Sequence, residues 1–173
     1  RYVRRCHIWL SAKFNYAISL LIASIILFIA VPTAWANPPA GEVLCAHTRG
    51  FHDGDTFACI RSAQHGSTTV VVRVAGIDAP ETGQLFWRTA RSHLRSLAIP
   101  GTAISCYKLD RYSRNVCRVH APDGRDIALE MVRSGLAWHA KAYAHEQTPQ
   151  QRHAYAAAES VARKKGVGLW AES

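Results

Sequence analysis

Two acidic stretches of this sequence contain the residues best suited to chemistry. The first is His52–Phe57, HDGDTF, in which Asp53 and Gly54 are typical of a turn and Asp55 stands where a strand resumes. Strands are depleted in Asp, and like charges this close repel each other. The second stretch follows the apolar run VVVRVAGI and begins at Asp78. If the two strands lie side by side, Asp55 and Asp78 converge at one end.

Two carboxylates at one place need a compensating charge, because their repulsion otherwise raises one pKa or separates the strands. A hard divalent cation resolves the conflict, and ligands that are all oxygen indicate Ca²⁺ or Mg²⁺ instead of zinc. The alternative is that Asp55 and Asp78 are unrelated surface acids at strand ends. Geometry inferred from the sequence does not decide between the two.

Arg73 lies inside the apolar run that precedes Asp78, where an unpaired charge is costly. It must therefore face a groove, pair with an acid or bind an anionic ligand. On strand geometry alone, a structural ion pair with Asp78 or Glu81 is the simplest of these interpretations.

The elements that would position these residues are mostly extended at first and helical later. β-Branched residues predict strands at Thr56–Ile60 and Thr68–Ile77, and a second pair is expected at Thr102–Tyr107 and Val116–Val119. Strands, an inserted helix, more strands and then two helices indicate an α+β domain. A small barrel of about five strands, a frequent nucleic-acid binder, fits this order.

Three helices are predicted from apolar spacing and capping residues. Residues at helical spacing place the first over Phe86–Leu97. Asp126 can cap a second, short helix. Thr148 begins a third with a Pro next to it and a Gln three residues on, and Gly166 is suited to end it.

The first 36 residues have the pattern of an export signal. Four basic residues and no acid precede an uncharged apolar run of sixteen residues, Tyr16–Val31, which is short for a membrane span. Ala34–Ala36 then gives a small-x-small pattern, so we expect cleavage before Asn37, one domain over residues 37–173, and a periplasmic or secreted protein. The alternative is an uncleaved anchor in the inner membrane.

Charge gives a weaker indication of partners. Without the first 36 residues, 17 Lys and Arg face 12 Asp and Glu, a net charge of +5. A basic balance suits a polyanion such as nucleic acid, although many secreted proteins are also basic.

Cysteine usage agrees with export. Four cysteines in the exported part predict two disulfides, for which the sequence alone allows three connectivities. Because each pair flanks a turn-like segment, we favour Cys45–Cys59 and Cys106–Cys117. A four-cysteine zinc site is disfavoured because no C-x2-C spacing occurs.

Four motifs together give this chain a family resemblance: HDGDTF, VRVAGIDAPE, DRYSRN and MVRSGLAW, in that order. In this order they resemble the staphylococcal nuclease (thermonuclease) family, over about Val43 to Trp170. The resemblance implies a five-stranded OB-fold barrel with three helices, and Ca²⁺-dependent cleavage of DNA and RNA phosphodiester bonds.

The resemblance also implies a set of metal ligands. Asp55 and Asp78 match the carboxylate ligands of Ca²⁺. The backbone carbonyl of Ala79 would complete the protein ligands, and Asp53 would act through water.

The implied catalytic residues are Glu81, Arg73 and Arg114. Glu81 matches the family's proposed general base, and the two arginines match those that hold the scissile phosphate. Water would attack phosphorus, the 5′ oxygen would leave, and the products would carry 3′-phosphates. Because all these side chains and both carboxylate ligands are present, the resemblance favours an active enzyme. We also expect a monomer without a stable protein partner. The rival functions are an inactive nucleic-acid-binding OB module and an envelope-associated protein that uses the barrel for protein contacts.

The implied substrate-binding residues are Arg111, Tyr112, Lys141 and Tyr143. Arg111 and Tyr112 match positions near the nucleotide phosphates. The family's type member carries two tyrosines where this chain has Lys141 and Tyr143. Lys141 can hold a phosphate as a point charge but cannot stack on a base. The four cysteines are a further departure from the type member.

Overall fold

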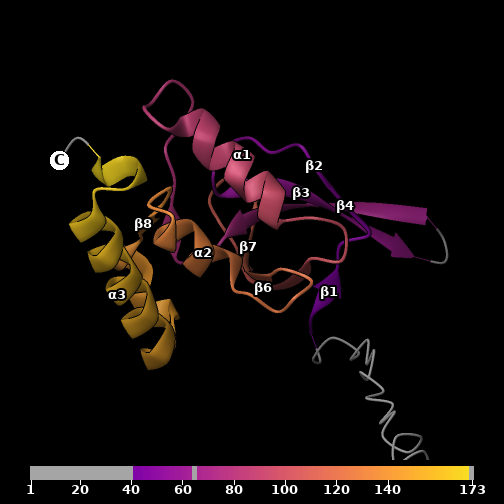
Figure 1. Cartoon of the computed structure of the whole chain (residues 1–173). Coiled ribbons are helices and arrows are strands. Elements are labelled where there is room, and N and C mark those ends of the chain that lie inside the picture. The colour runs from indigo at the N-terminus through magenta and orange to yellow at the C-terminus, as the bar shows by residue number, and fades with distance from the viewer. Residues whose placement is uncertain (1–40, 64–65, 172–173) are drawn as a thin grey trace, which may run out of the picture. The chain divides into compact units, whose positions relative to one another are not determined.

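The computed structural model describes residues 41–63 and 66–171, so the predicted signal segment, residues 1–36, lies outside the described residues. None of the helices in these two ranges is long and apolar enough to cross a membrane. Figure 1 shows the elements in chain order: β1 Val43–Leu44, β2 His47–Arg49, β3 Thr56–Ala63, β4 Gly66–Val74, β5 Ile77–Asp78, α1 Trp87–Leu97, β6 Ala103–Leu109, β7 Asn115–His120, α2 Ile127–Arg133, β8 Trp138–His139, the 3₁₀ turn η1 Lys141–Glu146, α3 Pro149–Lys165 and the 3₁₀ turn η2 Gly168–Trp170.

Most strands belong to one mixed sheet. Its order is β1-β6-β7-β4-β3-β2, and a separate two-stranded ladder joins β5 to β8. Within the large sheet β4 and β7 are parallel, and the other neighbours are antiparallel. The predicted α+β class with three α-helices is confirmed.

The two edge strands of this sheet, β1 and β2, are consecutive pieces of one chain segment. They are separated by Cys45 and Ala46, whose amides donate to Thr102 O and Ile60 O, each at 2.8 Å. The segment therefore passes from the β6 side of the sheet to β3 and connects its two edges. The five strands expected from the sequence correspond to β3, β4, β6, β7 and this divided first strand.

The strand predicted over Thr68–Ile77 is wrong in one respect, because it is broken in two. β4 ends at Val74, and Gly76 takes a positive φ of 78° before β5 begins. This left-handed conformation is strained for any residue with a Cβ, so the bend favours glycine. The bend moves Asp78 out of the large sheet and pairs it with Trp138 of β8.

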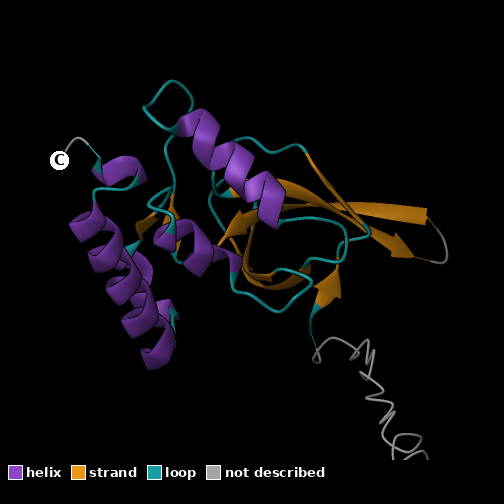
Figure 2. Cartoon of the chain, viewed as in Figure 1, coloured by secondary structure: helices purple, strands orange, loops and turns teal. Residues whose placement is uncertain are grey.

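The helices begin and end largely where capping residues predicted. The Asp126 side chain accepts a hydrogen bond from the Leu129 amide at the start of α2. Thr148 and Gln151 form a full capping box on α3, and Gly166 ends it in the left-handed conformation. Figure 2 shows α2 and α3 together on one side of the described domain, with the large sheet on the other.

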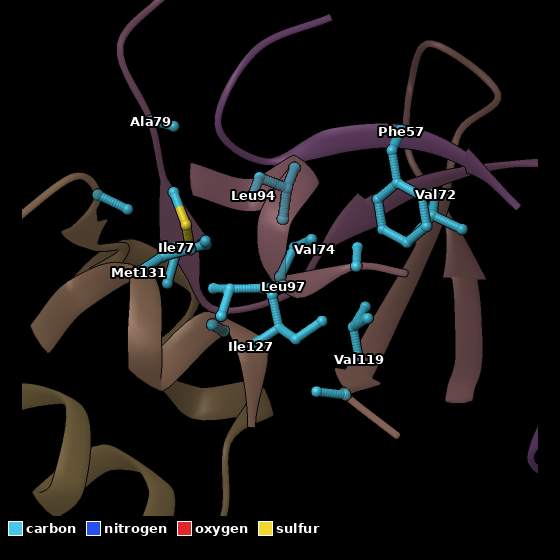
Figure 3. Packing of buried hydrophobic residues seen from close by; sticks show 14 of the residues in the cluster. Phe57, Val72, Val74, Ile77, Ala79, Leu94, Leu97, Val119, Ile127 and Met131 are labelled. Carbon is cyan, nitrogen blue, oxygen red and sulfur yellow. The ribbon is translucent and has the colours of Figure 1, made fainter. Parts of the chain in front are cut away.

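One hydrophobic core fills the space between the sheet and the helices. Figure 3 shows Leu94 and Leu97 of α1 beside Val74 of β4 and Ile127 of α2. Phe57 is fully buried on β3, directly after the acidic turn. The core therefore fixes the strand end that presents the first acidic stretch.

Both predicted disulfides are present. Cys45 is bonded to Cys59, and Cys106 to Cys117. Cys106 and Cys117 face each other directly in the β6–β7 ladder, and Cys45–Cys59 ties the divided first strand to β3. Each disulfide therefore closes a segment that carries predicted site residues.

Candidate active site

The acidic turn before β3 is closely packed. The Asp55 amide donates to Asp53 Oδ1 at 2.9 Å, which fixes the turn. The turn expected at Asp53 and Gly54 does not use a positive φ at Gly54. Gly54 is needed for space, since a Cβ there would lie 2.8 Å from the Cβ atoms of Ala79 and Ala90.

Asp55 is a buried carboxylate with three protein partners. Only 2% of the residue is exposed. Its Oδ2 accepts from the Ala79 amide at 2.9 Å and lies 3.1 Å from Arg73 Nη1, while Oδ1 accepts from Thr56 Oγ1 at 2.9 Å. Burial raises the pKa of Asp55 to about 7, although the Arg73 charge opposes the shift and Asp53 adds to it. The site therefore stabilises the carboxylate incompletely.

Arg73 joins the two acids that the sequence predicted to converge. Its Nη2 donates to Asp78 Oδ1 at 2.9 Å, and its Nη1 is the nitrogen beside Asp55. Nη1 also donates to Val74 O and Ile77 O at 3.0 and 2.9 Å. Asp55 and Asp78 thus meet on one guanidinium, and Asp78 has a largely exposed side chain.

Arg114 approaches the same place from the β6–β7 turn. Asp110 holds it by accepting from Arg114 Nε at 2.7 Å and from the Arg114 amide at 2.9 Å. Ser113 takes a positive φ of 61° in this tight turn. Arg114 Nη1 donates to Thr56 Oγ1 at 3.2 Å. Since Thr56 donates in turn to Asp55, one chain of polar contacts links both arginines and both acids.

The Glu81 side chain lies close to the acidic turn. Its amide donates to Gln84 Oε1 at 2.8 Å, which fixes the loop. A carboxylate oxygen of Glu81, an oxygen of Asp53 and a ring nitrogen of His52 all lie within 4.8 Å of one another. Burial tends to raise the pKa of Asp53, but hydrogen bonds from Asp55 and the neighbouring His52 hold it below its usual value.

This donor set fits a hard divalent cation. Asp53 and Glu81 supply carboxylate oxygens and His52 a ring nitrogen within one cluster, whereas Asp55 and Asp78 meet on the Arg73 guanidinium. Ala79 touches Asp55 through its amide, and the role of its carbonyl as a ligand stays a prediction. The group with the closest spacing differs from the predicted ligand set, with which it shares only Asp53.

A cavity of about 710 Å³ is lined by Arg73, Asp78 and Glu81 together with residues of the β6–β7 turn. Its lining includes eight residues that the sequence singled out: Arg73, Asp78, Glu81, Arg111, Tyr112, Arg114, Lys141 and Tyr143. Asp53, Asp55 and Ala79 do not line it, and Asp55 lies behind Arg73.

The predicted substrate-binding residues differ in their exposure and in their contacts with the rest of the protein. Tyr112 is exposed, with the guanidinium carbons of Arg111 and Arg114 at 5.0 and 5.3 Å from its ring centre. Tyr143 is also exposed. Lys141 instead pairs with Glu159 Oε2 of α3 at 2.5 Å.

That ion pair limits what Lys141 can do for a nucleotide. Glu159 is buried, and its other oxygen accepts from the His139 amide at 3.0 Å. Loss of Lys141 would leave this acid with an uncompensated charge. The structure therefore gives Lys141 a structural role beside its position on the cavity wall.

Several residues of the site were not recognised in the sequence. Thr56 connects Arg114 to Asp55, and Asp110 positions Arg114. Both lie inside quoted motifs, and the spacing of Asp110 four residues before Arg114 was an available signal. Glu146 accepts from Tyr107 at 2.9 Å and pairs with Lys108 on the cavity wall, and no motif pointed to it.

Several known proteins are similar to this chain in sequence. Residues 71–172 match the family described as "Staphylococcal nuclease homologue". An uncharacterized endonuclease of Haemophilus influenzae is 32% identical over 155 residues, which cover 89% of this chain and 79% of that protein. A micrococcal nuclease of Shigella flexneri is 34% identical over 165 residues, 90% of this chain and 86% of that protein. A staphylococcal-like nuclease of Arabidopsis thaliana is 35% identical over 104 residues, 59% of this chain and 30% of that protein.

Proposed function

Because this chain belongs to the family of staphylococcal nuclease homologues, we propose that it is a Ca²⁺-dependent nuclease that hydrolyses phosphodiester bonds of both DNA and RNA. Relatives named as nucleases and endonucleases support phosphodiester hydrolysis. The calcium dependence and the lack of preference between DNA and RNA are our extension of that family relationship.

The observation that carries the proposal is the chain of polar contacts from Arg114 through Thr56, Asp55 and Arg73 to Asp78. Arg73, Arg114 and Asp78 of this chain line a cavity large enough for a nucleotide, and Asp55 lies behind Arg73. A purely structural ion-pair network would not need an open cavity beside it. Perturbed carboxylates beside a cavity are typical of active sites.

The arginines would bind the anionic oxygens that otherwise repel a nucleophile. A planar guanidinium binds two oxygens at once and stays charged, which stabilises the charge of the transition state. Among the described residues, Arg114 makes its side-chain hydrogen bonds through Nε and Nη1, which leaves Nη2 available to a phosphate. Arg73 Nη2 must first leave Asp78.

Glu81 would act on the attacking water. Its side chain is exposed on the cavity wall, and its backbone is fixed by Gln84. A carboxylate there can orient water or accept its proton as the 5′ oxygen leaves, which gives 3′-phosphate products. Arg114, which also lines the cavity at the β6–β7 turn, would donate to the leaving oxygen.

Asp55 and Asp78 would hold the cation, with Asp53 behind them through water and the Ala79 carbonyl as a further ligand. When bound, Ca²⁺ supplies positive charge beside a phosphate oxygen. Binding would also compensate the buried charge of Asp55.

We place the enzyme in the periplasm or outside the cell, as a monomer. The export pattern in residues 1–36 and the two disulfides support an oxidising compartment. An uncleaved anchor in the inner membrane is the alternative that N-terminal sequencing of the exported protein distinguishes.

The proposal is tested by digestion of plasmid DNA and of RNA with Ca²⁺, with Mg²⁺ and with chelator, followed by analysis of product ends. We expect cleavage of both substrates with Ca²⁺, none with chelator, and 3′-phosphate ends. Cleavage that resists chelator would overturn the mechanism. Binding without cleavage under every condition would establish the inactive OB module instead.

A further inference from the structure

Helix α1 carries three arginines on one face. Arg88, Arg91 and Arg95 follow one another at spacings of three and four residues, which places them in a row along the helix. Arg88 and Arg95 are exposed and Arg91 is half-buried. The core side of the helix is formed by Ala90, Leu94 and Leu97. We call Arg88, Arg91 and Arg95 the arginine stripe.

The stripe is electrostatically unfavourable in the protein alone. The helix contains no acid, and no ion pair between a stripe residue and the described residues is recorded. Like charges at these spacings repel each other. Arg88 and Arg91 also lie near the helix N-terminus, where the helix dipole favours anions and disfavours cations. An anionic partner with several charges would relieve each of these conflicts.

The stripe begins beside the candidate active site. Trp87, the first residue of α1, donates from Nε1 to His52 O at 3.2 Å, next to the acidic turn. The Arg91 guanidinium carbon lies 4.6 Å from the centre of the Trp87 ring. Ala90 is so close to Gly54 that only glycine fits there. The helix start is therefore fixed against the turn that carries Asp53 and Asp55, and Figure 1 shows α1 leading away from that loop.

We propose that the arginine stripe binds successive phosphates of a nucleic-acid strand whose cleaved bond lies in the cavity. The inference rests on the proposed nuclease function and adds a substrate-binding surface to it. The seven helical rises from Arg88 to Arg95 span about 10 Å, the axial length of roughly three phosphate steps of one duplex strand. Arginine suits phosphate because its planar donors bind two oxygens. Contact of the helix start with the acidic turn of the candidate site favours a strand over an anionic membrane surface.

The stripe is tested by fluorescence anisotropy with a 20-nucleotide deoxythymidine strand, between about 50 and 200 mM salt, in chelator so that the strand is not cleaved. The test variant is Arg88→Gln/Arg91→Gln/Arg95→Gln, since Gln suits a helix. Three lost contacts should lower the slope of log affinity against log salt by about 2, at roughly 0.7 per phosphate of a single strand. Affinity at the lowest salt should fall at least about tenfold.

A matched control removes the same charge elsewhere. Arg61→Gln/Lys164→Gln/Lys165→Gln changes three exposed cations on β3 and at the end of α3. Its slope should change by less than about half as much as that of the stripe variant. Equal slopes in both variants, or no change in either, would overturn the proposal. If the triple variant does not fold, Arg95→Gln alone should lower the slope by about 0.7.

Two further measurements distinguish strand binding by the stripe from membrane binding and from catalysis. Binding of the protein to vesicles that contain phosphatidylserine tests whether the stripe binds a membrane surface. If the triple stripe variant loses vesicle binding but keeps its strand binding, the proposal is overturned. Because strand binding is measured without cleavage, it does not depend on the enzyme being active. Absence of cleavage with every metal would refute the proposed function and leave a fallen salt slope as support for the stripe.

Discussion

Two charged regions of the site hold their charges in different ways. We call the acidic turn with Asp53 and Asp55, which lies behind the cavity lining, the acid wall, and the β6–β7 turn, which lines the cavity, the arginine wall. On the acid wall, Asp53 and Asp55 are buried and fixed by backbone amides of Asp55 and Ala79. On the arginine wall, the β6–β7 turn is largely exposed, and Asp110 holds Arg114 through its amide and side chain.

The pKa values of Asp55 on the acid wall and Asp110 on the arginine wall are shifted in opposite directions. Burial raises the pKa of Asp55 to about 7, because its desolvation exceeds the help from Arg73. Slight burial tends to raise the pKa of Asp110, but the hydrogen bonds from Arg114 and Tyr112 outweigh it and hold this pKa below its usual value. Asp110 is therefore satisfied within the protein, and Asp55 is not. Under the proposed function, a cation would supply the charge compensation that Asp55 lacks.

Asp55→Asn should have the largest effect on cleavage. The amide keeps the shape of the side chain but removes the charge that would hold the cation, so Ca²⁺-dependent cleavage should fall by at least about 10³-fold. Initial rates on plasmid DNA measure this. Asp123→Asn, at an exposed acid that pairs with Arg125, is the control and should retain activity. Similar activity of the two variants would remove Asp55 from the site.

Arg114→Ala should follow, with kcat lower by about 10²- to 10³-fold and binding of substrate changed much less. The reason is that Arg114 is expected to act on the charge of the transition state. Single-turnover rates and binding constants separate the two effects. Arg111→Ala, in the same turn, should weaken binding more than kcat. A parallel loss of binding and rate in Arg114→Ala would assign it to ground-state binding.

The pH dependence of Ca²⁺ binding should show the state of Asp55. A cation binds the ionised carboxylate and must displace a proton below the raised pKa of about 7. Apparent affinity should therefore fall by about tenfold per pH unit below pH 7 and become constant above it. Without metal, Asp55 binds its proton more tightly in the folded than in the unfolded state, because its pKa is raised to about 7 by folding. This protonation stabilises the folded state fully below the unfolded pKa, and the stabilisation is lost as pH rises through 7. A flat affinity from pH 5 to 8 would contradict a buried, poorly compensated ligand.

The two disulfides should affect the two walls separately and most weakly. Replacing either pair with Ser should lower the free energy of unfolding by about 3 kcal/mol, since loops of 14 and 11 residues are closed. Loss of Cys106–Cys117 should lower kcat a few-fold, because this disulfide joins the two strands whose connecting turn carries Arg114. Loss of Cys45–Cys59 should weaken Ca²⁺ binding instead. The reverse pattern would contradict the division, and intact-mass analysis after alkylation should find no free thiol in the mature protein.

Sequence predicted the acid wall better than the arginine wall, for a physical reason. Asp55 stands out because an acid at the start of a buried strand is unfavourable without a partner, and the structure places it on Arg73 with Asp78. Capping residues likewise predicted α2 and α3, because caps depend on local hydrogen bonds.

Contacts between distant segments were not readable in the same way. After the bend at Gly76, β5 pairs with the distant β8, and the partner of Lys141 is Glu159 on another element. The division of the first strand also depends on both β3 and β6. These features arise from packing over long sequence separations, which neither periodicity nor a short motif encodes.

Calorimetric titration with Ca²⁺ in the absence of nucleic acid tests the central claim most directly. The acid wall is expected to bind the cation without help from the arginine wall. Wild-type protein and Arg114→Ala should therefore bind a single Ca²⁺ with similar affinity at pH 8, and folded Asp55→Asn should bind none. Binding by Asp55→Asn as tight as that of the wild type would contradict the account.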